Sequence, residues 1–274
     1  MAEINELEVL NIANSGGSLS EKDLTGLNLH RASLAGSNFS GSDVRGTNFR
    51  GANLSGADFS NAKLTEANLS EANLRQAIMS SSDMSDVFLI EARLFGTDFT
   101  NADLTGSNMR GAHMTGGVCL DGASLVGVNM RGANLAKGTL RNADLTVAVM
   151  SRVNMIDADL SGADLSAATL NGGIFTRANM KGVILRDAIL NASNLENARL
   201  DSADFTGASL RRCLFRGASL QMACLRDAML VASDLQGADL TLADLTGADL
   251  RGAVLLEANM SWTDLSETEF DDRV

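Results

Sequence analysis

A leucine, methionine or phenylalanine recurs at every fifth position over most of the chain. The run from Leu125 to Phe270 has no exception, and the run from Leu19 to Met114 includes one β-branched centre, Val44. The residue two positions before each centre is usually small, most often alanine, and the residue between them is usually Asn or Asp. A period of five fits neither the α-helix, with about 3.6 residues per turn, nor the β-strand, with a period of about 2. The pattern therefore predicts a solenoid built from one short unit.

The segment GANLSGADFS, Gly51 to Ser60, shows two of these units side by side. It resembles the pentapeptide-repeat family, whose motif is A(D/N)LXX, and the resemblance extends from about Leu19 to Phe270. The resemblance implies an all-β solenoid, a right-handed quadrilateral β-helix with four pentapeptides in each coil. It also implies a protein that is not an enzyme, and some members of the family mimic DNA and protect type II topoisomerases.

The repeat sets the expected organisation of the chain. Residues 19–270 are expected to form a single β-helix of about twelve coils, with each centre and the small residue before it pointing inward. No proline occurs, as suits coils that donate backbone N–H groups to one another. Residues 1–18 are expected to cap the first coil with a short helix whose apolar residues are Ile4, Leu7, Val9, Leu10 and Ile12, and 271–274 form a tail.

The five-residue register slips once, by one residue, within 115–122 and beside Gly116 and Gly117. Such an insertion is a bulge or a small protruding corner. Two interpretations stay open: a bend that aims the flanking segments differently, and an insertion that the fold tolerates without function.

Charge gathers on one predicted face. In a coil of twenty residues, side chains twenty positions apart stack in columns about 4.8 Å apart. The face with centres from Leu24 to Leu265 has Asp before most centres and holds most of the net charge of −12. One interpretation is a surface that attracts and orients a basic partner; the other is that Asp serves the fold, its carboxylate bound by local N–H groups. The partner-binding candidates are Asp83, Asp86, Asp103, Asp144, Asp164, Asp187, Asp204, Asp227 and Asp244.

Apolar residues at outward positions predict two further surfaces. The first is a compact patch within one coil, where Asn, Ser or Thr is usual, made of Ile78, Phe88, Ile90 and Phe95. The second is a column near the C-terminal end formed by Met222, Leu242 and Trp262. The tail from Ser266 to Val274 is one candidate cover for that column, and a contact between copies of the chain is the other.

Composition narrows the classes of function. The negative charge argues against a basic nucleic-acid-binding surface. Three scattered cysteines, Cys119, Cys213 and Cys224, have no metal-ligand spacing and fit a reducing cytoplasm. His30 and His113 fall far apart on outward positions, so neither a catalytic site nor a cofactor or metal is expected. No apolar run approaches the roughly 18 residues of a membrane span, and no leader pattern occurs.

Three hypotheses follow. The first, which we favour, is a non-catalytic scaffold, a monomer or weak dimer, that binds a cytoplasmic protein through the apolar patch or the acidic face. The second is a DNA mimic whose acidic face occupies the DNA-binding groove of a type II topoisomerase such as DNA gyrase. The third is a structural protein without a specific partner.

Overall fold

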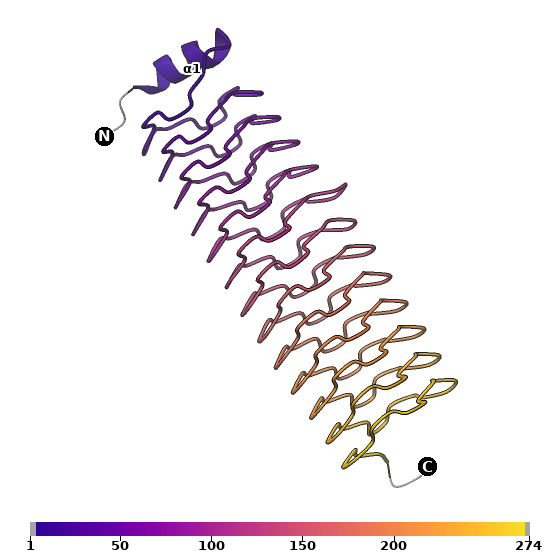
Figure 1. Ribbon diagram of the computed structural model, residues 1–274. Coiled ribbons are helices and arrows are strands. Elements are labelled where there is room, and N and C mark those ends of the chain that lie inside the picture. Colours follow the sequence, from indigo (N-terminus) through magenta and orange to yellow (C-terminus); the bar gives the residue numbers. More distant parts are fainter. Residues whose placement is uncertain (1–3, 272–274) are drawn as a thin grey trace. The chain divides into compact units, whose positions relative to one another are not determined.

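The computed structural model describes residues 4–271, and the chain falls into two compact units, Met1–Thr139 and Leu140–Val274. Each unit is a stack of four-sided coils, so the predicted β-solenoid is confirmed (Figure 1). Within residues 4–271 the structure has one helix, α1, Glu6–Asn14. The coils contain isolated parallel bridges in place of extended strands. The total of about twelve coils stays a prediction.

Parallel bridges join residues twenty positions apart in both units. In the first unit Asp23 pairs with Asp43, and in the second Asp144 pairs with Asp164. Around the first of these bridges the Leu24 N–H donates to the Asp43 carbonyl (2.8 Å) and the Asp43 N–H donates to the Lys22 carbonyl (2.9 Å). Residues twenty positions apart are thus neighbours in adjacent coils. Each of the four sides of a coil, which we call walls, contributes one residue to a series of such bridges, which we call a ladder.

A tight turn forms each corner. The Ala32 N–H donates to the Leu29 carbonyl (3.1 Å), three residues earlier, and Arg31 has a φ of 56°. A hydrogen bond of this span with positive φ at the third residue is typical of a type II turn, which favours glycine at that position. Glycine therefore recurs at the last position of the unit, for example Gly46 with φ 64°.

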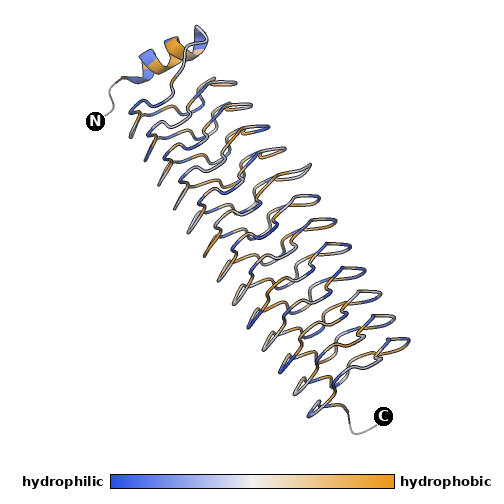
Figure 2. Ribbon diagram, in the orientation of Figure 1, coloured by the Kyte–Doolittle hydropathy of each residue, from blue (hydrophilic) through white to orange (hydrophobic). Residues whose placement is uncertain are grey.

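The inward centres fill the tube of each unit. In the first unit the rings of Phe39 and Phe59 stack with centroids 4.5 Å apart, and Phe49 meets the Phe39 ring edge-on at 5.9 Å. In the second unit Phe205 and Phe215 make an edge contact at 6.3 Å. Apolar and polar positions alternate around every coil (Figure 2). Each buried leucine contributes about 1.5–3 kcal/mol, so the repeated core stabilises both units.

The predicted N-terminal helix is present. The Asn5 side chain accepts from the Glu8 N–H (3.0 Å) and the Glu8 carboxylate accepts from the Asn5 N–H (2.9 Å), which is a capping box. Val9 is fully buried, and the Glu6 carboxylate accepts from the Asn28 N–H of a following coil (3.2 Å). Leu7 is 67% exposed, so its assignment to the apolar face is wrong.

The extra residue lies in the turn 115–117, where both Gly116 and Gly117 have positive φ, 81° and 91°. Bridge partners on either side of this turn are 21 residues apart, as in His113 with Asn134, and the spacing returns to twenty at Cys119 with Thr139. The first unit therefore absorbs the insertion locally, and its four ladders continue in register.

Candidate interaction surfaces

The aspartates singled out in the sequence stand on one wall in each unit, which we call the acidic wall. Its ladder in the first unit passes through Asp23, Asp43, Lys63, Asp83, Asp103 and Ser124. Its ladder in the second unit includes the bridges Asp144–Asp164, Ile184–Asp204 and Cys224–Asp244. Asp86, Asp187 and Asp227 occupy corners of the same wall, two positions after an inward centre.

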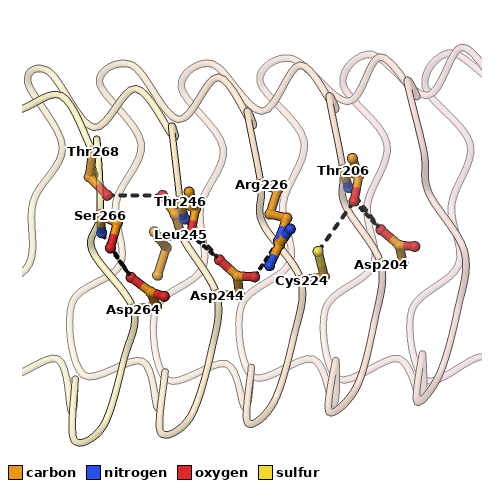
Figure 3. A network of polar contacts seen from close by, with 10 residues as sticks. All are labelled: Asp204, Thr206, Cys224, Arg226, Asp244, Leu245, Thr246, Asp264, Ser266 and Thr268. Atoms are coloured by element: carbon orange, nitrogen blue, oxygen red, sulfur yellow. Dashed lines mark hydrogen bonds and ion pairs between the residues drawn. The ribbon is translucent and has the colours of Figure 1, made fainter.

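The ladder aspartates hydrogen-bond to their own turns. The Thr246 backbone N–H and hydroxyl both donate to Asp244 Oδ1, at 3.0 and 2.6 Å, and Ser266 donates in the same way to Asp264, at 2.9 and 2.6 Å (Figure 3). An Asn or Asp that accepts from the N–H two residues later stabilises a turn. This contact explains why the repeat takes Asn or Asp before the centre and Ser or Thr after it.

Two arginines neutralise part of the acidic wall in the second unit. Arg186 Nε donates to Asp204 Oδ2 (2.6 Å), and Arg226 Nε donates to Asp244 Oδ2. Burial acts to raise the pKa of Asp244, but the hydrogen bonds from Thr246 and Arg226 outweigh it and lower the pKa below its ordinary value. These carboxylates are therefore ionised and firmly held at neutral pH.

The other candidate aspartates keep their charge uncompensated. Within residues 4–271, no ion pair forms at Asp83, Asp86, Asp103, Asp144, Asp164, Asp187 or Asp227. The corner aspartates lie against glycines of the next coil: an added Cβ at Gly106 would come within 2.4 Å of Asp86 Oδ1. The acidic wall thus presents free negative charge in each unit.

The four residues predicted as one apolar patch lie on three different walls. Ile78 is bridged to Asp58 and Asp98, whereas Phe88 is bridged to Asn68 and Asn108, ten residues away and therefore on the opposite wall. Ile90 shares the wall of Phe88 but is half-buried, and Phe95 follows the next centre. The prediction of a compact patch is wrong, because ten residues are half a coil. Phe88 and Phe95 remain exposed, at 44% and 40%.

Met222, Leu242 and Trp262 occupy equivalent corners of successive coils, with φ values of 56°, 61° and 60°. All three are exposed, and Trp262 is 85% exposed. The described part of the tail, up to Asp271, does not cover Trp262, and residues 272–274 lie outside the described residues. The column is open to a contact between copies, which stays a prediction.

A surface that the sequence analysis missed lies beside the insertion in the first unit. Its lining residues, which we call the basic groove, are Arg75, Arg93, Phe95, His113 and Thr115. Arg93 and His113 are bridged to each other, and the guanidinium carbon of Arg75 lies 4.9 Å from the centroid of the Phe95 ring. The signal in the sequence was an arginine, Arg93, at a ladder position that usually holds Asn or Asp.

Two observations on residues 4–271 concern reactive and metal-binding side chains. Burial raises the pKa of the Cys213 thiol to about 12, so this group is a thiol and not a nucleophilic thiolate at neutral pH. Residues 4–271 contain no group of three or more His, Cys, Asp or Glu side chains placed to hold a metal ion. No helix in this described part is long and apolar enough to span a bilayer.

This geometry defines a right-handed quadrilateral β-helix made of five-residue units. The model of the family "Pentapeptide repeats" matches residues 18–146, 148–187, 193–230 and 233–272. The chain therefore belongs to the pentapeptide repeat family.

Several solved structures are similar to the chain. HetL, a pentapeptide repeat protein involved in heterocyst differentiation regulation from Nostoc sp. strain PCC 7120, is 28% identical, with 99% of both chains covered and a TM-score of 0.36. QnrB1, a plasmid-mediated fluoroquinolone resistance protein, is 16% identical, with 91% of this chain and 90% of that one covered and a TM-score of 0.34. A pentapeptide repeat protein from the Arabidopsis thaliana thylakoid lumen is 32% identical, with 48% of this chain and 74% of that one covered and a TM-score of 0.21. No curated protein matches the chain.

Proposed function

We propose that this protein is a non-catalytic scaffold that binds a cytoplasmic protein partner through exposed side chains on the walls of its coils. The observation that carries the proposal is the exposure of Phe88 at a ladder position. Its bridge partners, Asn68 and Asn108, occupy the same ladder, so a polar residue forms the same backbone bridge at this position. Burying an aromatic side chain against a partner is favourable, and aromatic residues are enriched at protein interfaces.

Site-specific crosslinking in the native host tests the proposal. Phe88 is replaced by the photoreactive residue p-benzoylphenylalanine, and Asn38, an exposed residue on the opposite wall, is replaced in a matched control. We expect one protein adduct from position 88 that is absent from position 38. Loss of that adduct in a chain that also carries Ile90→Asp supports a contact centred on this wall. An equal spread of adducts from both positions would contradict it.

The acidic wall favours a second candidate, a partner whose basic DNA-binding groove accepts this wall in place of DNA, such as a type II topoisomerase. The unpaired carboxylates of Asp144, Asp164, Asp187 and Asp227 support it. Against it, Arg186 and Arg226 reduce the charge of the same wall. Duplex DNA carries a charge about every 1.7 Å of its axis, which this wall does not match in density.

Binding to purified gyrase separates the two candidates. If the acidic wall mimics DNA, added duplex DNA displaces the protein, and Asp164→Asn with Asp187→Asn weakens the complex. If the scaffold proposal holds, gyrase binding is absent or unaffected by DNA, and the crosslinked partner is another protein. The cytoplasmic location is tested by fractionation of the host.

A further inference from the structure

The basic groove lies on one wall of the first unit and crosses three consecutive coils. The bridges Asn73–Arg93 and Arg93–His113 place its ladder residues, and Arg75, Phe95 and Thr115 each follow an inward centre of the same wall. Arg75, Arg93, Phe95, His113 and Thr115 are all exposed. Within residues 4–271, none of the two guanidiniums and the imidazole forms an ion pair.

The charge pattern here differs from an ion pair that recurs in the second unit. An arginine directly after an inward centre reaches the ladder residue eighteen positions later, in the next coil. Arg186 pairs in this way with Asp204 (2.6 Å), and Arg216 pairs with Asp234 (2.5 Å). Arg226 repeats the contact with Asp244.

Arg75 occupies the same position in its unit, but the residue eighteen positions later is Arg93. The site therefore holds two cations where the second unit holds an ion pair at Arg186, Arg216 and Arg226. Two like charges on one wall are unfavourable unless an anion joins them, and a carboxylate accepts from guanidinium groups in short, charge-assisted hydrogen bonds.

An exposed aromatic ring completes the groove. The Arg75 guanidinium lies over the ring of Phe95, a favourable cation–π arrangement. The same ring rests against Gly116, where an added Cβ would come within 2.0 Å of it. Gly116 belongs to the turn that holds the inserted residue, so the insertion provides part of the surface on which the ring packs. The groove thus offers cationic groups beside an apolar ring.

We infer that the basic groove binds an acidic peptide segment of a protein partner, with a carboxylate held by Arg75 and Arg93 and an adjacent apolar side chain on the Phe95 ring. This inference rests on the proposed scaffold function and adds the chemistry of the partner. A short acidic segment brings its charge only to the groove. The net charge of −12 opposes a long polyanion such as a nucleic acid.

A displayed library of random peptides, selected against the full chain, tests the inference. We expect the enriched sequences to share at least one Asp or Glu next to an aromatic or aliphatic residue. The best peptide is then labelled with fluorescein and its affinity measured by fluorescence anisotropy. Arg75→Ala with Arg93→Ala is expected to weaken binding roughly tenfold or more, as is usual for the loss of charge-assisted hydrogen bonds.

The matched control is Arg110→Ala with Arg131→Ala. It removes two exposed arginines from another wall of the same unit, so its charge change is identical. We expect unchanged affinity in the control and unchanged melting in both double variants. Enriched peptides without acids, equal affinity in the two double variants, or stronger competition by a single-stranded oligonucleotide than by the acidic peptide would each overturn the inference.

The scaffold proposal can fail independently. A specific adduct at position 88, together with a groove that selects no acidic peptide, would support the scaffold proposal and contradict the peptide-binding inference. Acidic peptides that bind the groove, without any host partner crosslinked at position 88, would support the peptide-binding inference and contradict the role of the Phe88 wall in partner binding.

Discussion

The two units have the same kind of core and differ in the ion pairs on their walls. In the second unit Arg177, Lys181, Arg186, Arg216, Arg226 and Arg251 are each paired with a carboxylate. In the first unit Arg45 and Arg50 are paired with carboxylates, but Arg75 and Arg93 form no ion pair within residues 4–271. The first unit also contains the insertion and the exposed rings of Phe88 and Phe95.

The comparison separates what the fold requires from what it permits. Inward positions are filled by apolar or small side chains, because the coils above and below close the tube. Outward positions at the same ladder accept Asp, Asn, Arg or Phe with the same backbone hydrogen bonds. Arg75 and Arg93, which lack the ion pair that Arg186 forms with Asp204, are therefore the cations to test for a bound ligand.

The largest effect should come from an inward charge in either unit. Leu64→Asp and Leu165→Asp each bury a carboxylate at a fully buried position, at a cost of about 2–7 kcal/mol or more. Because the cores are alike, we expect both variants to lose cooperative melting by circular dichroism to a similar extent. The neighbouring surface change Asp164→Asn is the control. Melting of Leu165→Asp like that of the wild type would show that the inward assignment is wrong.

The insertion gives the next largest effect, and only the first unit can show it. Gly127→Ala, with free space around its Cβ and φ of 65°, should cost roughly 1–2 kcal/mol from its left-handed backbone. Gly116→Ala should cost more, because its Cβ meets the Phe95 ring. Denaturant unfolding measures both, and Phe95→Ala should relieve the excess at Gly116. An equal cost at both glycines, with no relief, would mean that the ring does not rest on this turn.

A smaller effect concerns the acid stability of the second unit. The Asp244 pKa is lowered in the folded state, so its contribution to stability is present above the ordinary value of 3.8 and is lost as pH falls through the lowered pKa. Thr246→Val removes one donor to Asp244 Oδ1 and should cost about 1 kcal/mol or less at neutral pH. Acid unfolding should then begin at higher pH than in the wild type. The same onset in both proteins would contradict the role of this hydroxyl.

The smallest effect is expected at the surface ion pairs. Arg186→Ala removes an exposed partner of Asp204, and such surface ion pairs contribute little to stability. We expect melting indistinguishable from that of the wild type by calorimetry. A clear fall in melting temperature would show that ion pairs, in addition to the core, hold the second unit together.

Much of this structure follows from the period of five. Because inward residues must fill a closed tube, centres such as Leu24 and Phe205 are recognisable by their size. The coil of twenty residues is implied by the family resemblance, and the bridges between residues twenty positions apart confirm it. A coil of twenty residues places Ile78 and Phe88, which are ten positions apart, on opposite walls. The sequence therefore already argues against a single apolar patch. The contact of Arg75 with Phe95 and the packing of that ring on Gly116 depend on side-chain rotamers and on the shape of one inserted turn. No repeat pattern encodes those features.

The most direct test of the account is a reciprocal exchange of charge between the units, measured by thermal melting. Arg93→Asp gives Arg75 the acidic partner that Arg186 has, and Asp204→Arg gives Arg186 the cationic neighbour that Arg75 has. Since the groove cations are surplus to the fold, we predict that Arg93→Asp melts at or above the wild-type temperature and that Asp204→Arg melts below it. A fall with Arg93→Asp as large as that with Asp204→Arg would contradict the account, because Arg93 would then serve the fold and not a ligand.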